Sequence, residues 1–272
     1  MQRVGEHPVP VGPLAVRWRA WQLDDVRAGA LTHAHLALEN AGSAAWRSAA
    51  DDGVLLSYHW LDERGNAIVW DGIRTELPDQ APPGSAVELE ASLRAPIPPG
   101  RYRLAFDLVR EHRYWLAELG NAPLELDVDV RPRIDRRALA VRGADEATLA
   151  DQEEPAVPEA EAVAIAHLAP GLVPAPDWTR RVLDAHAEGF GIVAGSVDSG
   201  RRIRRRGSAL EPYAPGRGRI PGFPNPLVCP SVLVGVAADW VEPVAGLPAL
   251  APPRGQHEEP WVYDGRIELR RG

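Results

Sequence analysis

Aromatic residues stand beside charged residues at two points in the first half of the chain. One is Trp70-Asp71-Gly72-Ile73-Arg74, and the other is Tyr114-Trp115. Flat aromatic rings stack on the apolar C–H faces of sugars, and polar groups next to them can hydrogen-bond hydroxyl groups. We therefore predict a ligand-binding surface. Its expected residues are Trp70, Asp71, Arg74, Tyr114 and Trp115.

Packing in a hydrophobic core is the alternative explanation for most tryptophans of this half. They are Trp18, Trp21, Trp46, Trp60, Trp70 and Trp115. Alternation along a strand would place Tyr58 and Trp60 on one face and His59 on the other. Some of these rings must therefore be core residues, and the surface around Trp70 remains the best candidate for a ligand.

Other groups with reactive or charged side chains give weaker indications. His33 and His35 would share a strand face, a spacing that could bind a metal, but no third ligand stands nearby, so solvated or cross-strand-paired histidines are favoured. Cys229 lies in an apolar run and is expected to be buried and inert. We predict no catalytic residue, no metal and no cofactor.

The segment Arg201–Arg206 has five arginines in six positions. It could contact nucleic acid, an anionic lipid surface or a sugar-nucleotide phosphate. The alternative is a solvated turn that pairs with acidic residues, and the net charge of −8 favours it. We therefore expect no nucleic-acid partner.

The candidate residues of the first half must be positioned by short strands, because apolar and polar residues alternate there. The predicted strands are 14–21, 31–40, 54–61, 67–70, 87–93, 102–108 and 124–131. A period of two with one polar face is typical of antiparallel sheets wetted on one side. Pro82-Pro83-Gly84 and Pro98-Pro99-Gly100 stand directly before strands, and Tyr102 follows the second turn as in a tyrosine corner.

These patterns predict a mainly β protein. Residues 1–131 are expected to form an antiparallel immunoglobulin-like β-sandwich, residues 132–161 an acidic connector, and residues 162–272 a smaller, Pro-rich, partly irregular α/β module. In that module we predict a strand at 162–168, a helix that Asp177 caps and Gly189 ends, and a strand at 191–197. Asp264-Gly265 indicates a hairpin.

Composition narrows the setting. A single cysteine rules out an intrachain disulfide. The first residues lack the apolar run of a signal peptide, and no uninterrupted apolar stretch is long enough to span a membrane. These features predict no membrane span and a cytoplasmic location.

The first half resembles a known type of module. Leu38-Glu39-Asn40-Ala41-Gly42 with Trp46, then 56–61, Val69-Trp70-Asp71-Gly72, Pro83-Gly84 and Pro99-Gly100-Arg101-Tyr102 are similar to bacterial immunoglobulin-like modules. Such modules are appended to glycosyltransferases and other polysaccharide-assembly proteins. The resemblance covers roughly residues 14–131, and the carbohydrate-binding sandwich of O-antigen exporters is similar more loosely.

Residues 162–198 resemble the middle of a family-two (GT-A type) glycosyltransferase. The shared features are the strand, the Pro-rich loop, Pro174-Ala175-Pro176-Asp177-Trp178 and the strand flanked by glycine. In that family the strand ends in an Asp-x-Asp motif, whose carboxylates hold a divalent cation against the sugar-nucleotide diphosphate. His167-Leu168-Ala169-Pro170-Gly171 stands there instead, so the resemblance implies a shortened, inactive relative.

Together these features predict a non-catalytic accessory or binding protein of bacterial surface-glycan assembly. The sandwich would bind a saccharide or a partner enzyme. Two alternatives stay open: a glycosyltransferase with an atypical metal-free site, and a structural or interaction protein with no role in carbohydrate chemistry.

Overall fold

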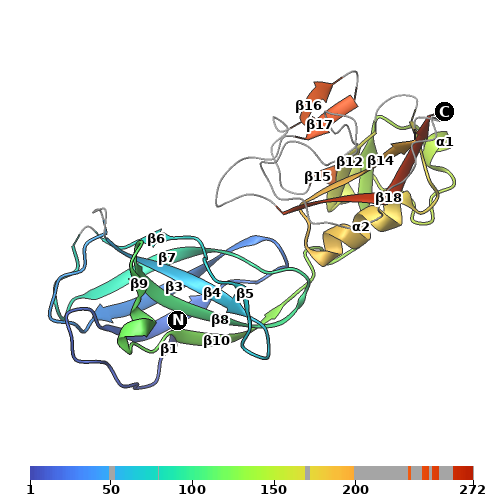
Figure 1. The fold of residues 1–272 in the computed structure, drawn as a ribbon. Helices are drawn as coiled ribbons and strands as arrows, with labels where there is room; N and C mark the ends of the chain where they lie inside the picture. The colour runs from blue at the N-terminus through green and yellow to red at the C-terminus, as the bar shows by residue number, and fades with distance from the viewer. Residues whose placement is uncertain are drawn as a thin grey trace. The chain divides into compact units, whose positions relative to one another are not determined.

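The computed structural model describes residues 1–48, 53–78, 80–168, 172–198, 232–233, 241–244, 247–250 and 260–271. Within these residues the protein is mainly β, as the sequence predicts. The chain divides into two compact units, Met1–Arg131 and Pro132–Gly272. Figure 1 shows both units and labels most of their helices and strands.

The first unit consists of two antiparallel sheets that face each other across a common core. The four-stranded sheet has the order β1-β2-β3-β7, and the six-stranded sheet has the order β10-β8-β4-β5, with β6 paired to β4 and β9 paired to β8. The strands are β1 (Gln2–Arg3), β2 (Val16–Leu23), β3 (Leu31–Asn40), β4 (Val54–Leu61), β5 (Ala67–Val69), β6 (Thr75–Glu76), β7 (Ala86–Arg94), β8 (Gly100–Arg110), β9 (Tyr114–Trp115) and β10 (Leu124–Val130). A 3₁₀ helix, η1 (Leu116–Leu119), follows β9.

Alternate residues of the strands build the core of this sandwich. Leu36, Leu38, Trp60 and Phe106 are fully or almost fully buried in one apolar cluster. Burial of such side chains removes apolar surface from water and supplies the main driving force for folding. The predicted β-sandwich is therefore confirmed. The seven predicted strands correspond to β2, β3, β4, β5, β7, β8 and β10, and β3 and β4 match their predicted bounds. The two-residue strands β1, β6 and β9 were not predicted.

Side-chain hydrogen bonds fix two connections of the sandwich, the loop after β3 and the predicted turn before β8. Asn40 is buried and bridges the loop that follows β3: its Nδ2 donates to the Ala44 and Ala81 carbonyls at 2.9 and 2.8 Å, and its Oδ1 accepts from Gly42 N–H at 3.0 Å. The Tyr102 hydroxyl donates to the Pro98 carbonyl at 2.7 Å. This bond is the expected tyrosine corner.

The second unit is a mixed sheet with one main helix. The sheet order is β11-β12-β15-β14-β18-β13, where β11 runs parallel to β12 and β14 runs parallel to β18. The elements are β11 (Leu139–Arg142), α1 (Glu146–Leu149), η2 (Glu159–Glu161), β12 (Ala164–His167), β13 (Leu172–Pro174), α2 (Trp178–Glu188), β14 (Ile192–Asp198), β15 (Val232–Leu233) and β18 (Trp261–Arg271), with β16 (Val241–Val244) and β17 (Leu247–Leu250) as a separate pair.

Residues 132–161, predicted as an acidic connector, contain β11, α1 and η2. Their acidic side chains pair with arginines of the same unit. Arg142 donates to both Glu159 carboxylate oxygens at 2.8 Å, and Arg137 Nε donates to Glu154 at 2.8 Å. Arg142 is the last residue of β11 and Arg137 precedes this strand, so both ion pairs hold the predicted connector against a strand that pairs with β12.

Helix α2 starts and ends where the sequence predicts, but its first turn is stabilised differently. Asp177 is the N-cap residue and Gly189 the C-cap residue. The Asp177 side chain makes no capping hydrogen bond; its carboxylate instead accepts from Arg181 Nε at 2.5 Å. An ion pair one turn along the helix thus replaces the expected cap.

The predicted hairpin at Asp264-Gly265 is wrong, because β18 runs through this position. Gly195 pairs with Asp264 and Ser196 pairs with Glu268, so β18 carries extra residues opposite β14. The Asp264 carboxylate accepts hydrogen bonds from the Arg266 backbone N–H at 2.9 Å and from its guanidinium. These local bonds stabilise an irregularity within β18, at the position where the sequence predicted that the chain would reverse direction.

Among the helices of the described residues, none combines the length and the apolar composition needed to cross a membrane.

Candidate ligand-binding site

The candidate site lies on the outward face of the six-stranded sheet. Adjacent strand residues point to opposite faces, so residues between the core positions of β4 and β8 point away from the core. Ser57, His59 and Asp107 occupy such positions, yet they are only 1%, 4% and 1% exposed. Ser57 and Asp107 are direct cross-strand partners. Outward-facing polar residues this buried need a cover, and two segments of the chain supply it.

The first covering segment, 70–74, follows β5. Its Gly72 N–H donates to the Tyr58 carbonyl of β4 at 3.0 Å. A Cβ at Gly72 would come within 2.6 Å of that oxygen, so only glycine permits this close approach. Trp70 stacks on His59 with ring centroids 4.1 Å apart and planes at 23°, and its carbonyl accepts a hydrogen bond from His59 Nδ1.

The second covering segment is formed by β9 and η1. Trp115 meets His59 edge to face with centroids 4.2 Å apart, and its ring lies 6.1 Å from that of Trp70. The Ala117 N–H donates to Asp107 Oδ2 at 3.1 Å. Ring contacts and a backbone hydrogen bond therefore fix this segment against the sheet.

A hollow of about 200 Å³ opens where the two segments meet the sheet. We call it the Trp70 hollow. Trp70 at this hollow is 55% exposed, whereas Trp115 is 9% exposed. The volume is below the usual range for drug-sized ligands and suits a single small ring. The lining residues used below are His59, Trp70, Asp107, Trp115, Glu118 and Glu125.

Burial sets the protonation of two lining groups. It raises the pKa of the Asp107 carboxyl to about 7, and the nearby charge of Glu118 acts in the same direction, while N–H groups of Ala117 and Leu108 oppose the shift. Burial also lowers the pKa of His59. Because the Trp70 carbonyl can only accept, His59 Nδ1 carries the proton of the neutral ring.

The other two acidic groups are held by neighbours. Glu118 Oε1 accepts from the Trp115 backbone N–H at 3.2 Å. Glu125 Oε2 lies 3.5 Å from Arg103 Nη1, and both side chains are about half exposed. The hollow therefore combines aromatic rings with carboxylate acceptors, an arrangement that can stack on a ring and accept hydrogen bonds from it.

Arg74 supports the site without lining the hollow. Its guanidinium lies 5.1 Å from the centre of the Trp115 ring. Its Nη2 donates to Asp71 at 2.8 Å, its Nε to Glu111 at 3.0 Å, and its Nη1 to the Ser57 hydroxyl at 2.8 Å. These bonds fix the guanidinium beside Trp115 and tie the first covering segment to β4.

The structure thus brings four of the five predicted site residues together. Trp70 and Trp115 line the hollow, and Asp71 and Arg74 form the supporting ion pair. Tyr114 does not join them. It precedes Trp115 on a strand, packs against the hydrophobic core, and its hydroxyl accepts a hydrogen bond from Arg110 at 3.3 Å.

Sequence reasoning missed His59, Asp107, Glu118 and Glu125 as lining residues. Alternation did indicate that His59 faces away from Trp60, and the same pattern places Asp107 and Glu125 on the outward face. It does not reveal that later parts of the chain cover His59 and Asp107. Glu118 lies in η1, which has no periodic pattern in the sequence.

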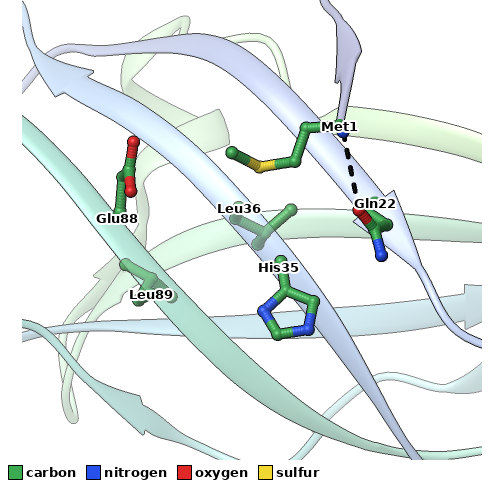
Figure 2. A pocket seen from close by; sticks show the side chains of 6 residues that line it. All are labelled: Met1, Gln22, His35, Leu36, Glu88 and Leu89. Atoms are coloured by element: carbon green, nitrogen blue, oxygen red, sulfur yellow. Dashed lines mark hydrogen bonds between the residues drawn. The ribbon is translucent and has the colours of Figure 1, made fainter.

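A wider hollow of about 490 Å³ lies on the four-stranded sheet. Figure 2 shows its lining, where the N-terminal amine donates to Gln22 Oε1 at 3.5 Å and the side chain of Met1 lies beside Leu36. His35 lines it too, and its Nδ1 lies 3.6 Å from Glu90, its cross-strand partner. None of its lining residues has a large aromatic ring, so it lacks a stacking surface.

The structure gives no support to a metal site at the histidines singled out in the sequence. In the described part of the chain, no group of three or more His, Cys, Asp or Glu side chains is placed to hold a metal ion. His33 pairs with Ser92 across β3 and β7. Cys229, Arg201–Arg206 and residues 169–171 lie outside the described residues.

Two of the side chains that helix α2 buries, His186 and Trp178, each have a polar atom without a hydrogen-bond partner among the described residues. His186 is fully buried, its Nδ1 donates to the Phe190 carbonyl at 2.7 Å, and burial lowers its pKa to about 3. Its Nε2 and the Nε1 of Trp178 have no hydrogen-bond partner. The hollows described above do not include these atoms, so we assign them a packing role.

Comparisons with known proteins identify no family. No family model matches this chain, and no curated protein matches it. Among solved structures, the C-terminal domain of wzt is 9% identical with a TM-score of 0.31, over 46% of this chain and 77% of that domain. A family 123 glycoside hydrolase from Clostridium perfringens is 10% identical with a TM-score of 0.25, over 66% of this chain and 34% of the hydrolase. Similarities this weak carry no functional argument.

Proposed function

We propose that the first unit binds a saccharide at the Trp70 hollow, and that the protein is a non-catalytic accessory of bacterial glycan assembly. One observation carries the proposal: the half-exposed indole of Trp70, stacked on His59 beside Trp115, borders a hollow that also contains carboxylates. Tryptophan is highly buried on average in folded proteins, and exposed indoles are enriched where a protein meets a partner.

The chemistry of the hollow suits a sugar ring. An indole face packs on the C–H face of a pyranose, and carboxylates accept hydrogen bonds from its hydroxyl groups. The rigid sheet below and the Arg74 network behind Trp115 hold these groups in place before a ligand arrives. Such preorganisation lowers the entropy cost of binding.

A glycan array with three forms of the full chain tests this function. We expect the natural protein to retain a defined set of glycans, and Trp70→Ala to lose them. Ile68→Ala is the matched control, because Ile68 is 48% exposed on β5 and does not line the hollow. Equal loss in both variants, or an array with no signal, would contradict saccharide binding at Trp70.

Calorimetry with nucleotide sugars, with and without Mn²⁺, separates this function from glycosyl transfer. A transferase must bind its sugar-nucleotide donor, whereas the proposed accessory protein needs only the glycan. We expect no heat of binding from the nucleotide sugars. Binding that depends on Mn²⁺ would support the transferase alternative and contradict the non-catalytic role.

A further inference from the structure

We propose that the sugar bound in the Trp70 hollow carries a protonated amine, as an amino sugar with a free amino group does. This inference rests on the proposed saccharide-binding function and specifies its ligand.

The side chains that line the hollow give it a negative charge. Among the described residues that line the hollow, three are acidic, namely Asp107, Glu118 and Glu125, and none is Arg. Arg103 Nη1 lies 3.5 Å from Glu125 Oε2, and Arg103 Nε lies 3.7 Å from Asp127 Oδ1. One guanidinium is thus shared by two carboxylates, and a net negative charge remains beside the hollow. A cation in the hollow therefore gains electrostatic energy, and an anion loses it.

Three aromatic rings also line the hollow. His59, Trp70 and Trp115 lie within 4.1 to 6.1 Å of one another, measured between centroids. The π faces of such rings attract cations, and indole attracts them most strongly. Arg74, 5.1 Å from the centre of Trp115, already makes a contact of this type within the protein.

The Arg74 guanidinium does not compensate the negative charges of the hollow. The Arg74 guanidinium is balanced by Asp71 and Glu111, with N–O distances of 2.8 and 3.0 Å. It therefore compensates these two acids and not the three that line the hollow. Burial disfavours a carboxylate without a compensating charge, and the raised pKa of Asp107 reflects this cost. An ammonium group from the ligand would supply the missing charge.

The same features select against acidic sugars. A uronic acid or a sugar phosphate would bring an anion towards Glu118 and Glu125, and the negative charges of these side chains would repel it. N-acetylated sugars keep the stacking face but lose the positive charge. The proposal therefore orders three classes of ligand: free amino sugars bind best, N-acetylated or neutral sugars bind more weakly, and acidic sugars bind least.

Calorimetry with the full chain and a matched pair of ligands tests the inference. The pair is a glucosamine oligomer and its fully N-acetylated counterpart of equal length, titrated near neutral pH. We expect the free amine to bind about tenfold more tightly, and this preference to shrink as salt concentration rises. The N-acetylated oligomer should show a weaker dependence on salt.

Two variants locate the charge that carries the preference. Glu118→Gln keeps an oxygen that can accept the Trp115 N–H, so the segment should stay folded while one negative charge is removed. We expect it to lower the affinity for the amine several-fold and to change that for the N-acetylated oligomer little. Glu88→Gln is the control, because Glu88 is an exposed acid on the other sheet.

The outcomes separate this inference from the function on which it rests. Equal or tighter binding of the N-acetylated oligomer, abolished by Trp70→Ala, would overturn the inference and leave saccharide binding intact. An equal loss of amine affinity in Glu88→Gln and Glu118→Gln would also overturn it. No binding of either oligomer, together with an array without signal, would overturn both proposals.

Discussion

Asp107 shows most clearly how one residue departs from what its position in a strand predicts. It points away from the core, yet only 1% of it is exposed, and its carboxyl accepts N–H groups of Leu108 and Ala117 at 2.7 and 3.1 Å. Two hydrogen bonds favour the ionised form, while loss of hydration disfavours it. Desolvation is the larger effect, because the pKa rises to about 7 from an ordinary value of 3.8.

This raised pKa predicts a stability that falls as pH rises. Between pH 3.8 and about 7, folded Asp107 keeps a proton that the unfolded chain releases. The free energy of unfolding should therefore decrease across this interval, by at most a few kcal/mol. Urea denaturation at a series of pH values should give a flatter profile for Asp107→Asn. Asp127→Asn is the control on the same sheet face, and identical profiles for Asp107→Asn and the natural protein would refute the assignment.

At the level of secondary structure, the covering segments depend on a few buried polar side chains. Asn121 follows η1 and is 3% exposed. Its Oδ1 accepts from Val16 N–H at 2.9 Å, and its Nδ2 donates to the Leu116 and Leu14 carbonyls at 3.0 and 3.3 Å. One amide thus joins the end of the second covering segment to the start of β2.

Replacing this amide should destabilise the first unit. Asn121→Ala removes the side-chain partner of the Val16 N–H and of the Leu14 carbonyl, whereas the Leu116 carbonyl keeps its bond from the backbone N–H of residue 121. We expect a loss of about 3 kcal/mol in the free energy of unfolding. Urea denaturation followed by tryptophan fluorescence measures it. Asn66→Ala, in an exposed turn, should cost about 0.5 kcal/mol or less. A loss below about 1 kcal/mol for Asn121→Ala would show that the amide is dispensable.

The strands were predictable from sequence because each has one face in the core and one outside. Leu36 and Leu38 alternate with His35 and Ala37, and this pattern alone fixes β3. The cover over Asp107 was not predictable, because segments 70–74 and 115–118 have no regular period. Trp70 and Trp115 were found through residue type, whereas their meeting at His59 depends on the pairing of β9 with β8.

On the scale of the whole molecule, the first unit is compact and has its own hydrophobic core. Its core cluster is formed by residues of 16–130 alone. Arg131 closes it: its N–H donates to Val26 O, its carbonyl accepts from Ala28 N–H, both at 2.9 Å, and its guanidinium pairs with Asp25. The size is within the usual range for a domain.

We therefore expect a fragment of residues 1–131 to fold alone and to bind the same glycans as the full chain. Circular dichroism should give a β spectrum, urea should unfold the fragment in one cooperative transition, and Trp70→Ala should abolish array signals as in the full chain. A fragment of 1–124 is the control, because it lacks most of β10 and Arg131 and should not fold. A cooperative fragment that has lost glycan binding would show that the second unit contributes to the site.

The alternation of β4 has a consequence for how this protein can change over generations. Tyr58 and Trp60 pack in the core. Ser57 and His59 alternate with them and face the candidate site, where His59 lines the hollow and Ser57 bonds Arg74. Because the two sets point to opposite faces of the sheet, we expect substitutions of Ser57 or His59 to change the candidate site more than the core. Insertion of a single residue into β4 would turn the inward side chains outward and the outward ones inward, and would disrupt the core and the candidate site together.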